Sequence, residues 1–141
     1  MAAVPNEWEV VPNCGVRRTG ENVFPSTVVV TEEVLPEGMT LQRYVTNSIG
    51  IMRRLLTEPN IKGPDAFAFP DVEQAQRLDV AYKSNDERSV VQRQIYTLAA
   101  GQVGIVTFTT VAEEASSVSG AFRMIGGGLR FATKDSAKPT P

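Results

Sequence analysis

Residues 88–111, RSVVQRQIYTLAAGQVGIVTFTTV, decide the fold that we expect for this chain. Two stretches rich in Val, Ile, Thr, Tyr and Phe flank a short break, Ala99-Ala100-Gly101-Gln102. This pattern predicts two antiparallel strands joined by a tight turn that contains glycine. We therefore expect this hairpin to form the centre of an antiparallel sheet.

Both faces of the predicted hairpin carry apolar side chains. Side chains alternate across a strand, so the residues of the first strand divide into two sets. One face receives Val91, Arg93, Ile95 and Thr97, and the other receives Val90, Gln92, Gln94, Tyr96 and Leu98. A sheet that is apolar on both sides needs a cover on both sides. A helix can supply one cover, and what supplies the other is the functional question.

The segments before the hairpin predict two strands and one amphipathic helix. Strands are expected at 8–11 and 27–31, with the turn-forming stretch 12–22 between them. Thr40 is the expected N-cap of a helix that runs to about Glu58. Its apolar stripe recurs at three- and four-residue steps. The stripe contains Leu41, Tyr44, Val45, Ser48, Ile49, Met52, Leu55 and Leu56.

The remaining segments predict a loop, one more strand and a closing helix. Residues 59–73 contain three prolines and are expected to form a loop, in which 66–69 is a short strand or an anchor. A strand is expected at 76–83, and a helix at 112–126 that the glycines 126–128 end. The order β-β-α-β-β-β-α predicts an α+β fold, with an antiparallel sheet and flanking helices.

Length and composition predict a single domain. The chain has 141 residues, of which 42% are hydrophobic and 21% charged, as in ordinary globular proteins. We expect one domain over residues 1–131 and a disordered polar tail over residues 132–141. The start of the chain does not resemble a secretory signal, and no apolar run reaches the length of a membrane span. These features predict a cytoplasmic location.

Composition also argues against several classes of function. The net charge of −2 disfavours a nucleic-acid partner. The absence of histidine removes the commonest general base and metal ligand. Cys14 and the pair Glu113-Glu114 are the best enzyme candidates, but a turn residue and helix-start charges explain them more simply. We expect no catalytic residue, no metal and no cofactor.

Polar residues interrupt the apolar surfaces at two places. Gln92 and Gln94 share a strand face with Val90, and Ser48 lies on the helix stripe one turn before Met52. A buried amide costs free energy unless its donors and acceptors are paired. Gln94 therefore bonds a neighbouring loop of its own chain, lies on a face that is simply exposed to water, or lies in an open groove that accepts a guest. The residues alone leave these interpretations open.

The arrangement resembles a known family. A β-branched strand precedes a helix that contains Tyr44-Val45, and the strands Arg93-Gln94-Ile95-Tyr96 and 105–110, IVTFTT, precede a closing helix. This order resembles the DcrB-like proteins (domain of unknown function 1795), which have the Mog1/PsbP-like α/β/α sandwich fold. Within that family, the chain is most similar to the effector-associated (Eag) chaperones of bacterial type VI secretion.

The resemblance implies a function and a site. These chaperones are cytoplasmic homodimers that hold the hydrophobic N-terminal helices of a secreted effector before loading on the secretion spike, without inserting stably in the membrane. Gln94 matches the family's strand glutamine, whereas Ser48 stands where the family has a helix glutamine. The implied partner-binding groove is completed by the apolar residues Val23, Val29, Met52, Leu56 and Val90.

Two other functions remain open at this stage. The first is a regulatory module of the Mog1/PsbP type that binds a folded partner through charged surface residues. The second is a hydrolase that uses Cys14 or a carboxylate pair. The absence of catalytic machinery and the resemblance favour the non-enzymatic chaperone or adaptor.

Overall fold

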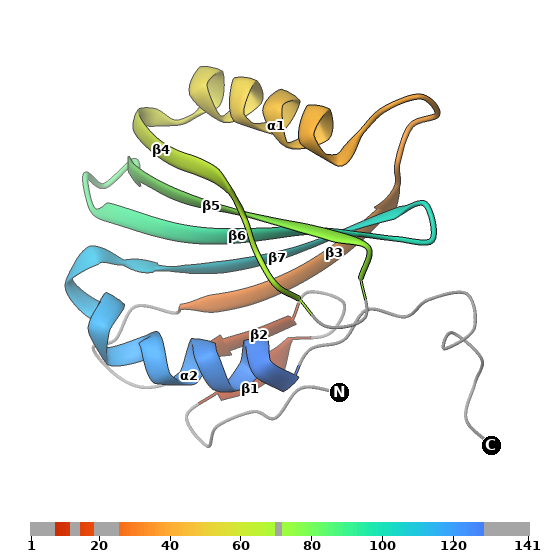
Figure 1. The fold of residues 1–141 in the computed structure, drawn as a ribbon. Helices are drawn as coiled ribbons and strands as arrows, with labels where there is room; N and C mark the ends of the chain where they lie inside the picture. The colour runs from red at the N-terminus through yellow and green to blue at the C-terminus, as the bar shows by residue number, and fades with distance from the viewer. Residues whose placement is uncertain (1–7, 12–14, 19–25, 70–71, 129–141) are drawn as a thin grey trace.

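A computed structural model describes residues 8–11, 15–18, 26–69 and 72–128. Its described strands form one antiparallel sheet of seven strands, in the order β1-β2-β3-β7-β6-β5-β4. One helix lies on each face of this sheet (Figure 1). The α+β class predicted from the sequence is therefore confirmed. The elements are β1 (Trp8–Val11), β2 (Gly15–Arg18), β3 (Thr27–Val34), α1 (Leu41–Leu55), β4 (Thr57–Ala66), β5 (Gln74–Lys83), β6 (Ser89–Ala99), β7 (Gln102–Val111) and α2 (Ala115–Gly128).

The hairpin of β6 and β7 forms the inner part of the sheet, as predicted. Ala99 pairs with Gln102, so a two-residue turn joins the strands. Ala100 and Gly101 both have positive φ, at 52° and 78°. Positive φ at both turn residues matches the right-handed twist of the flanking strands. β3 then pairs with β7, and β5 pairs with β6.

The predicted loop at 59–73 is wrong for its first half, because Thr57–Ala66 forms the edge strand β4. Prolines argue against an inner strand but are tolerated at an edge, where no partner needs the missing N–H. The register shifts between Thr57 and Asn60 and between Lys62 and Asp65, and these irregular intervals contain the strand's prolines. β4 therefore bends and crosses toward the level of α2 (Figure 1).

Several other boundaries also differ from the predictions, and β3 and β5 are each longer than expected. The stretch 12–22 contains the strand β2, which pairs with both β1 and β3. α1 ends at Leu55 instead of about Glu58, and Leu56 is its C-cap. A 3₁₀ turn over Ala112–Glu114 precedes α2, which continues to Gly128. The expected domain end at residue 131 and the tail over 132–141 lie outside the described residues.

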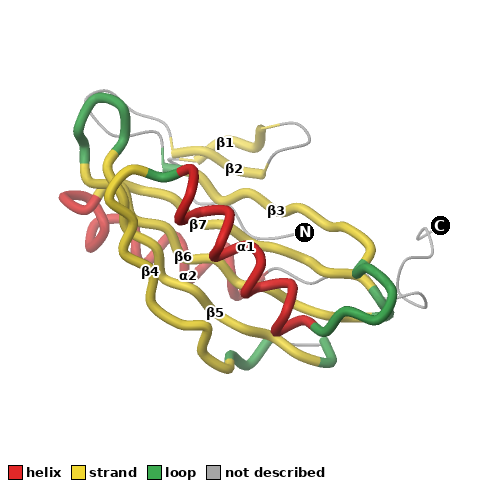
Figure 2. Tube along the Cα trace, turned by 90° about the horizontal axis from the view of Figure 1, so that it is seen from above, coloured by secondary structure: helices red, strands yellow, loops and turns green. Residues whose placement is uncertain are grey.

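α1 forms where its cap and its apolar stripe predicted. The Thr40 side chain accepts a hydrogen bond from the Arg43 N–H at 3.1 Å. Arg53 and Arg54 lie in the last turn, where positive charge complements the helix dipole. Seen from above, α1 crosses the sheet diagonally, and β3 and the hairpin of β1 and β2 are not beneath it (Figure 2).

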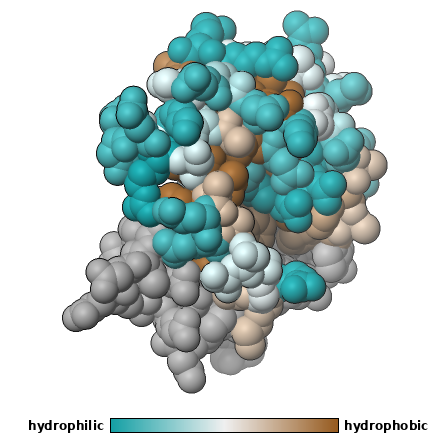
Figure 3. Space-filling view, turned by 90° about the vertical axis from the view of Figure 1, so that its left-hand side faces the viewer, coloured by the Kyte–Doolittle hydropathy of each residue, from teal (hydrophilic) through white to brown (hydrophobic). Residues whose placement is uncertain are grey.

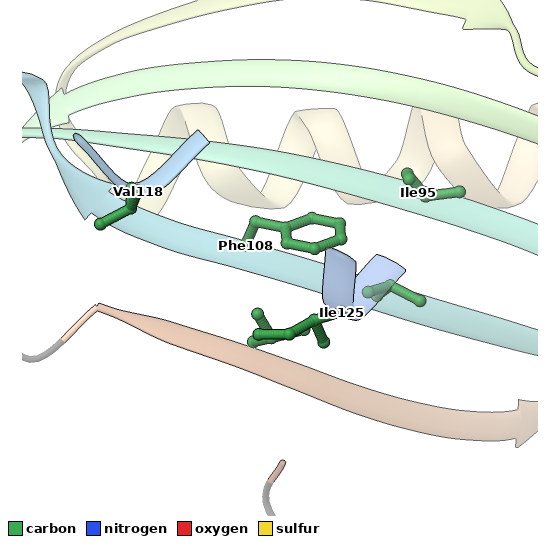
Figure 4. Packing of buried hydrophobic residues seen from close by; sticks show 6 residues of the cluster. Ile95, Phe108, Val118 and Ile125 are labelled. Atoms are coloured by element: carbon green, nitrogen blue, oxygen red, sulfur yellow. The ribbon is translucent and has the colours of Figure 1, made fainter. Parts of the chain in front are cut away.

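Each face of the sheet has its own hydrophobic cluster. The cluster under α1 is built on Leu41, Val45, Leu78, Tyr96 and Val103. The cluster under α2 contains Val28, Ile95, Val106, Phe108, Val118 and Ile125. Figure 4 shows Ile95 of β6 and Phe108 of β7 on the side of the sheet where Val118 and Ile125 of α2 lie. The two helices thus cover opposite faces, so α2 supplies the second cover that the sequence left open.

Candidate functional site

The described residues of the predicted groove lie on the α1 side of the sheet. Met52 and Leu56 belong to the cluster under α1, and Ser48 lies half-buried between them and Tyr44. Val29 pairs with Thr107, which pairs with Gln94, so these residues form one cross-strand row on the same face. Strand alternation places Val90 on this face as well. Val23 lies outside the described residues.

Gln94 is part of a closed network of side chains. Its Nε2 donates to Gln92 Oε1 at 2.9 Å and lies 3.5 Å from Met52 Sδ. Its Oε1 accepts a hydrogen bond from the Tyr96 hydroxyl at 2.6 Å. The residue is only 8% exposed. The chain therefore satisfies the amide with side chains of β6 and α1, and not with a neighbouring loop as one interpretation of the sequence had it.

The groove over Gln94 is filled in this structure. Met52 of α1 contacts the amide, and Val90 is buried. The structure therefore shows the Gln94 amide covered by α1 and not lying in the floor of an open groove. The sequence could not show this, because a helix stripe does not reveal at which angle the helix crosses the sheet.

The exposed part of this surface is a flank of α1. Tyr44, Ser48, Ile51 and Leu55 recur at helical spacing, which places them on one flank. The Tyr44 end packs on Tyr96, with ring centroids 6.1 Å apart. At the other end, Ile51 is 47% and Leu55 77% exposed. We call this set the α1 flank, and its C-terminal half presents apolar side chains to solvent.

Burial controls the ionisation of Tyr96 beside the α1 flank. Burial raises the pKa of the Tyr96 hydroxyl above its ordinary value of 10.0, although a contact with the Ser48 hydroxyl acts in the opposite direction. The hydroxyl therefore remains protonated and continues to donate to Gln94 at neutral pH. The Ser48 side chain also donates to the backbone carbonyl of Tyr44 at 3.1 Å.

One of the enzyme candidates lies in the described part of the chain as an ion-paired carboxylate. Glu113 accepts a hydrogen bond from Arg88 at 2.8 Å, as an exposed ion pair, and Cys14 lies outside the described residues. No group of three metal-ligating side chains occurs in the described ranges. Neither described helix is long and apolar enough to cross a membrane.

A second candidate site, which the sequence did not predict, lies on the α2 side of the sheet. A hollow of about 630 Å³ opens between α2, β5, β6 and the segment after β4. Its apolar lining includes the four phenylalanines Phe67, Phe69, Phe108 and Phe122 together with Ile95. The run 66–69 was the available signal, since two aromatic residues in a polar loop indicate an anchor.

Charged side chains accompany this hollow. Lys62, Arg93 and Arg123 line it together with a single carboxylate, Asp79. Arg93 Nε contacts that carboxylate at 2.8 Å, so one positive charge is neutralised within the lining. Figure 3 shows the left-hand end of the molecule, where apolar surface runs between hydrophilic patches in the described part.

Comparisons with solved structures support this fold. The protein of unknown function PA94 from Pseudomonas aeruginosa, described as a putative regulator, aligns with a TM-score of 0.71 at 14% identity, over 95% of this chain and 86% of that chain. LpqN of Mycobacterium tuberculosis, involved in cell envelope biogenesis, aligns with a TM-score of 0.65 at 19% identity, over 90% of this chain and 79% of that chain. The cyanobacterial PsbP of Synechocystis sp. PCC 6803 aligns with a TM-score of 0.61 at 12% identity, over 93% of this chain and 85% of that chain.

Two further comparisons concern the sequence. No curated protein sequence matches the chain. The DcrB family model matches residues 16–125, which include every element from β3 to β7 and most of α2. Because this match spans most of the chain, the chain belongs to the DcrB family.

Proposed function

We propose that this protein is a non-enzymatic, cytoplasmic chaperone or adaptor that shields the hydrophobic N-terminal helices of a type VI secretion effector before loading on the secretion spike. The observation that carries the proposal is the α1 flank, where Ile51 and Leu55 present apolar surface beside the Gln94 network. Membership of the DcrB family and the resemblance to the Eag chaperones are consistent with it.

The physical basis of the proposal is the cost of a membrane helix in water. A transmembrane segment exposes about 20 apolar residues. Covering this surface gains roughly 25 cal/mol per Å² of apolar area. A guest helix on the α1 flank would contact Ile51, Leu55 and Met52, and would reach toward Val29 on β3, which α1 does not cover.

The Gln94 network could add a hydrogen bond to the guest if the guest displaces Met52. A guest that displaces Met52 would free Gln94 Nε2 to bond a carbonyl of the guest, because Gln92 and Tyr96 already hold the amide in place. Ser48 has a shorter side chain than the glutamine expected at its position. It would therefore contact a guest only where the guest backbone approaches α1 closely.

The direct test is co-expression with an effector that begins with apolar helices and is encoded beside this protein's gene. We expect Ile51→Glu and Leu55→Glu to lower the amount of soluble effector, because a carboxylate would be buried against the guest. Thr46→Glu is the matched control, since it adds the same charge at another exposed position of α1. Thermal unfolding of each variant alone shows whether the fold is intact.

Two outcomes would contradict the proposal. The first is an effector that stays equally soluble with Ile51→Glu, Leu55→Glu and wild type. The second is complex formation that depends on exposed charge, such as the Asp65–Arg77–Asp79–Arg93 ion pairs of β4, β5 and β6. That result would favour a regulatory module that binds a folded partner, and such a role is compatible with a PsbP-like fold.

A further inference from the structure

The hollow on the α2 side differs from the surface used in the proposed function, and Gln92 of β6 is the residue of the Gln94 network that also belongs to its lining. The hollow faces α2, whereas Gln94, Met52 and the α1 flank lie on the opposite side of the sheet. Its volume of about 630 Å³ lies inside the range of roughly 300–1,000 Å³ that small-molecule sites occupy. It is therefore large enough to hold a small organic ligand.

The walls of the hollow favour an apolar chain. Four phenylalanines and Ile95 belong to the lining, and the rings of Phe108 and Phe122 are tilted by 57° with centroids 5.2 Å apart. The core cluster under α2 supports these rings from behind, with Val118 and Ile125 almost fully buried. A ring wall held in this way is already in place before a ligand enters, which reduces the cost of binding.

The charges at the hollow favour an anionic group on that chain. Lys62 of β4 and Arg123 of α2 are both exposed, and neither forms an ion pair within the described part of the chain. Asp79 is the one carboxylate in the lining, and Arg93 already contacts it. The lining therefore carries a positive excess, although the whole chain has a net charge of −2.

We propose that this hollow binds a free single-chain amphiphile with an anionic head, of the fatty-carboxylate class. The hydrocarbon chain lies against Phe67, Phe69 and Phe122, and the carboxylate lies at the solvent side between Lys62 and Arg123. The head gains two positive partners, and the chain removes the aromatic wall from water. Nothing covalent is involved, and the ligand enters and leaves unchanged.

Titration with decanoate and dodecanoate, read by displacement of a fluorescent fatty acid, tests the apolar part. We expect affinity to rise roughly fourfold for each added CH₂, the ratio that corresponds to about 0.8 kcal/mol per buried CH₂. Ser119→Trp, which places a large ring in the lining, should abolish binding. Ser117→Trp is the matched control, because Ser117 is an exposed residue of α2 outside the lining.

The charge of the head is tested by a second pair of variants. Lys62→Glu with Arg123→Glu should weaken dodecanoate roughly tenfold and leave dodecanol unchanged. Arg53→Glu with Arg54→Glu makes the same change in net charge on α1 and should have no effect. All four positions are exposed, so the fold should tolerate these substitutions.

Several results would overturn the inference. Equal affinity for dodecanoate, dodecanol and dodecyltrimethylammonium would show that the cations do not select the head. Binding that survives Ser119→Trp would place the ligand elsewhere. Association with anionic phospholipid vesicles, without binding of free dodecanoate, would indicate a membrane surface as the ligand. None of these results would touch the proposed function, whose variants lie on the other face.

Discussion

At the scale of single residues, the most informative group is the Gln94 amide. An apolar strand face with a glutamine in it predicts either a ligand or an internal network, and the partners decide between them. Here Gln92, Met52 and Tyr96 together occupy the donor and acceptor atoms of the amide. The amide thus connects β6 to α1. This network is complete only while the Tyr96 hydroxyl stays protonated and donates to Gln94 Oε1.

Tyr96→Phe tests this dependence. At neutral pH the variant leaves Gln94 Oε1 without its donor, so we expect a loss of about 1–3 kcal/mol of unfolding free energy. Because burial raises the pKa of Tyr96 in the folded state, wild-type stability should fall as pH rises above 10.0 and through the folded pKa. Phenylalanine does not ionise, so the variant lacks the part of this alkaline fall in stability that Tyr96 causes. Denaturant unfolding between neutral pH and pH ~11 measures the difference.

The difference in unfolding free energy between wild type and Tyr96→Phe should therefore become smaller at high pH. Tyr82 also has a pKa raised by burial, but it is present in both proteins and cancels in the comparison. A difference that stays constant over the alkaline range would show that Tyr96 ionises equally in the folded and unfolded states.

At the scale of elements, β4 shows how tertiary context overrides local sequence. Pro59, Gly63 and Pro64 are typical of a loop, yet β4 pairs with β5 from Thr57 to Ala66. Gly63 makes this possible, because its φ is +107° and a Cβ there would lie 2.7 Å from the Arg77 carbonyl oxygen. The backbones of β4 and β5 approach too closely for any other residue.

Gly63→Ala should therefore destabilise the fold by about 1–3 kcal/mol, because the left-handed backbone and the close carbonyl both oppose a Cβ. Gly50→Ala is the control. A Cβ at Gly50 meets nothing within 4 Å, and alanine in a helix interior should stabilise α1 by roughly 0.5–1 kcal/mol. Thermal unfolding of each variant measures the effect. Unfolding temperatures that shift in the same direction for both variants would contradict this account.

At the scale of the whole molecule, the sheet has two different edges. β4 is irregular and rich in proline, and such edges resist pairing with another sheet. β1 is the opposite edge and pairs only with β2 among the described strands. The homodimer implied by the family resemblance stays a prediction, and if two copies pair by their sheets, the β1 edge is the available one.

Crosslinking distinguishes the two edges. In a Cys14→Ser background, a short bismaleimide should join copies of Glu9→Cys into dimers and leave Asn60→Cys, on β4, monomeric. Sedimentation velocity over a concentration series gives the oligomeric state without a crosslinker. Equal crosslinking at both positions, or none in a sample that sediments as a dimer, would show that pairing does not occur through β1.

The sequence by itself determined the parts of this protein that rest on local patterns. The β6–β7 hairpin, the Thr40 cap and the amphipathic stripe of α1 follow from strand alternation, turn glycine and helical spacing, which act over a few residues. The residues that share a face also follow, since side chains alternate along a strand. Val29, Met52 and Gln94, by contrast, were grouped through the family resemblance, and the structure places all three on the α1 side of the sheet.

Only the tertiary structure decided which parts of each face are covered. The angle at which α1 crosses the sheet buries Gln94 and leaves Leu55 exposed, and no local pattern encodes that angle. The hollow beside Phe67 exists because β4 bends toward α2, which depends on contacts between residues far apart in the chain. Coverage is a property of packed surfaces, so it appears only once the elements are placed together.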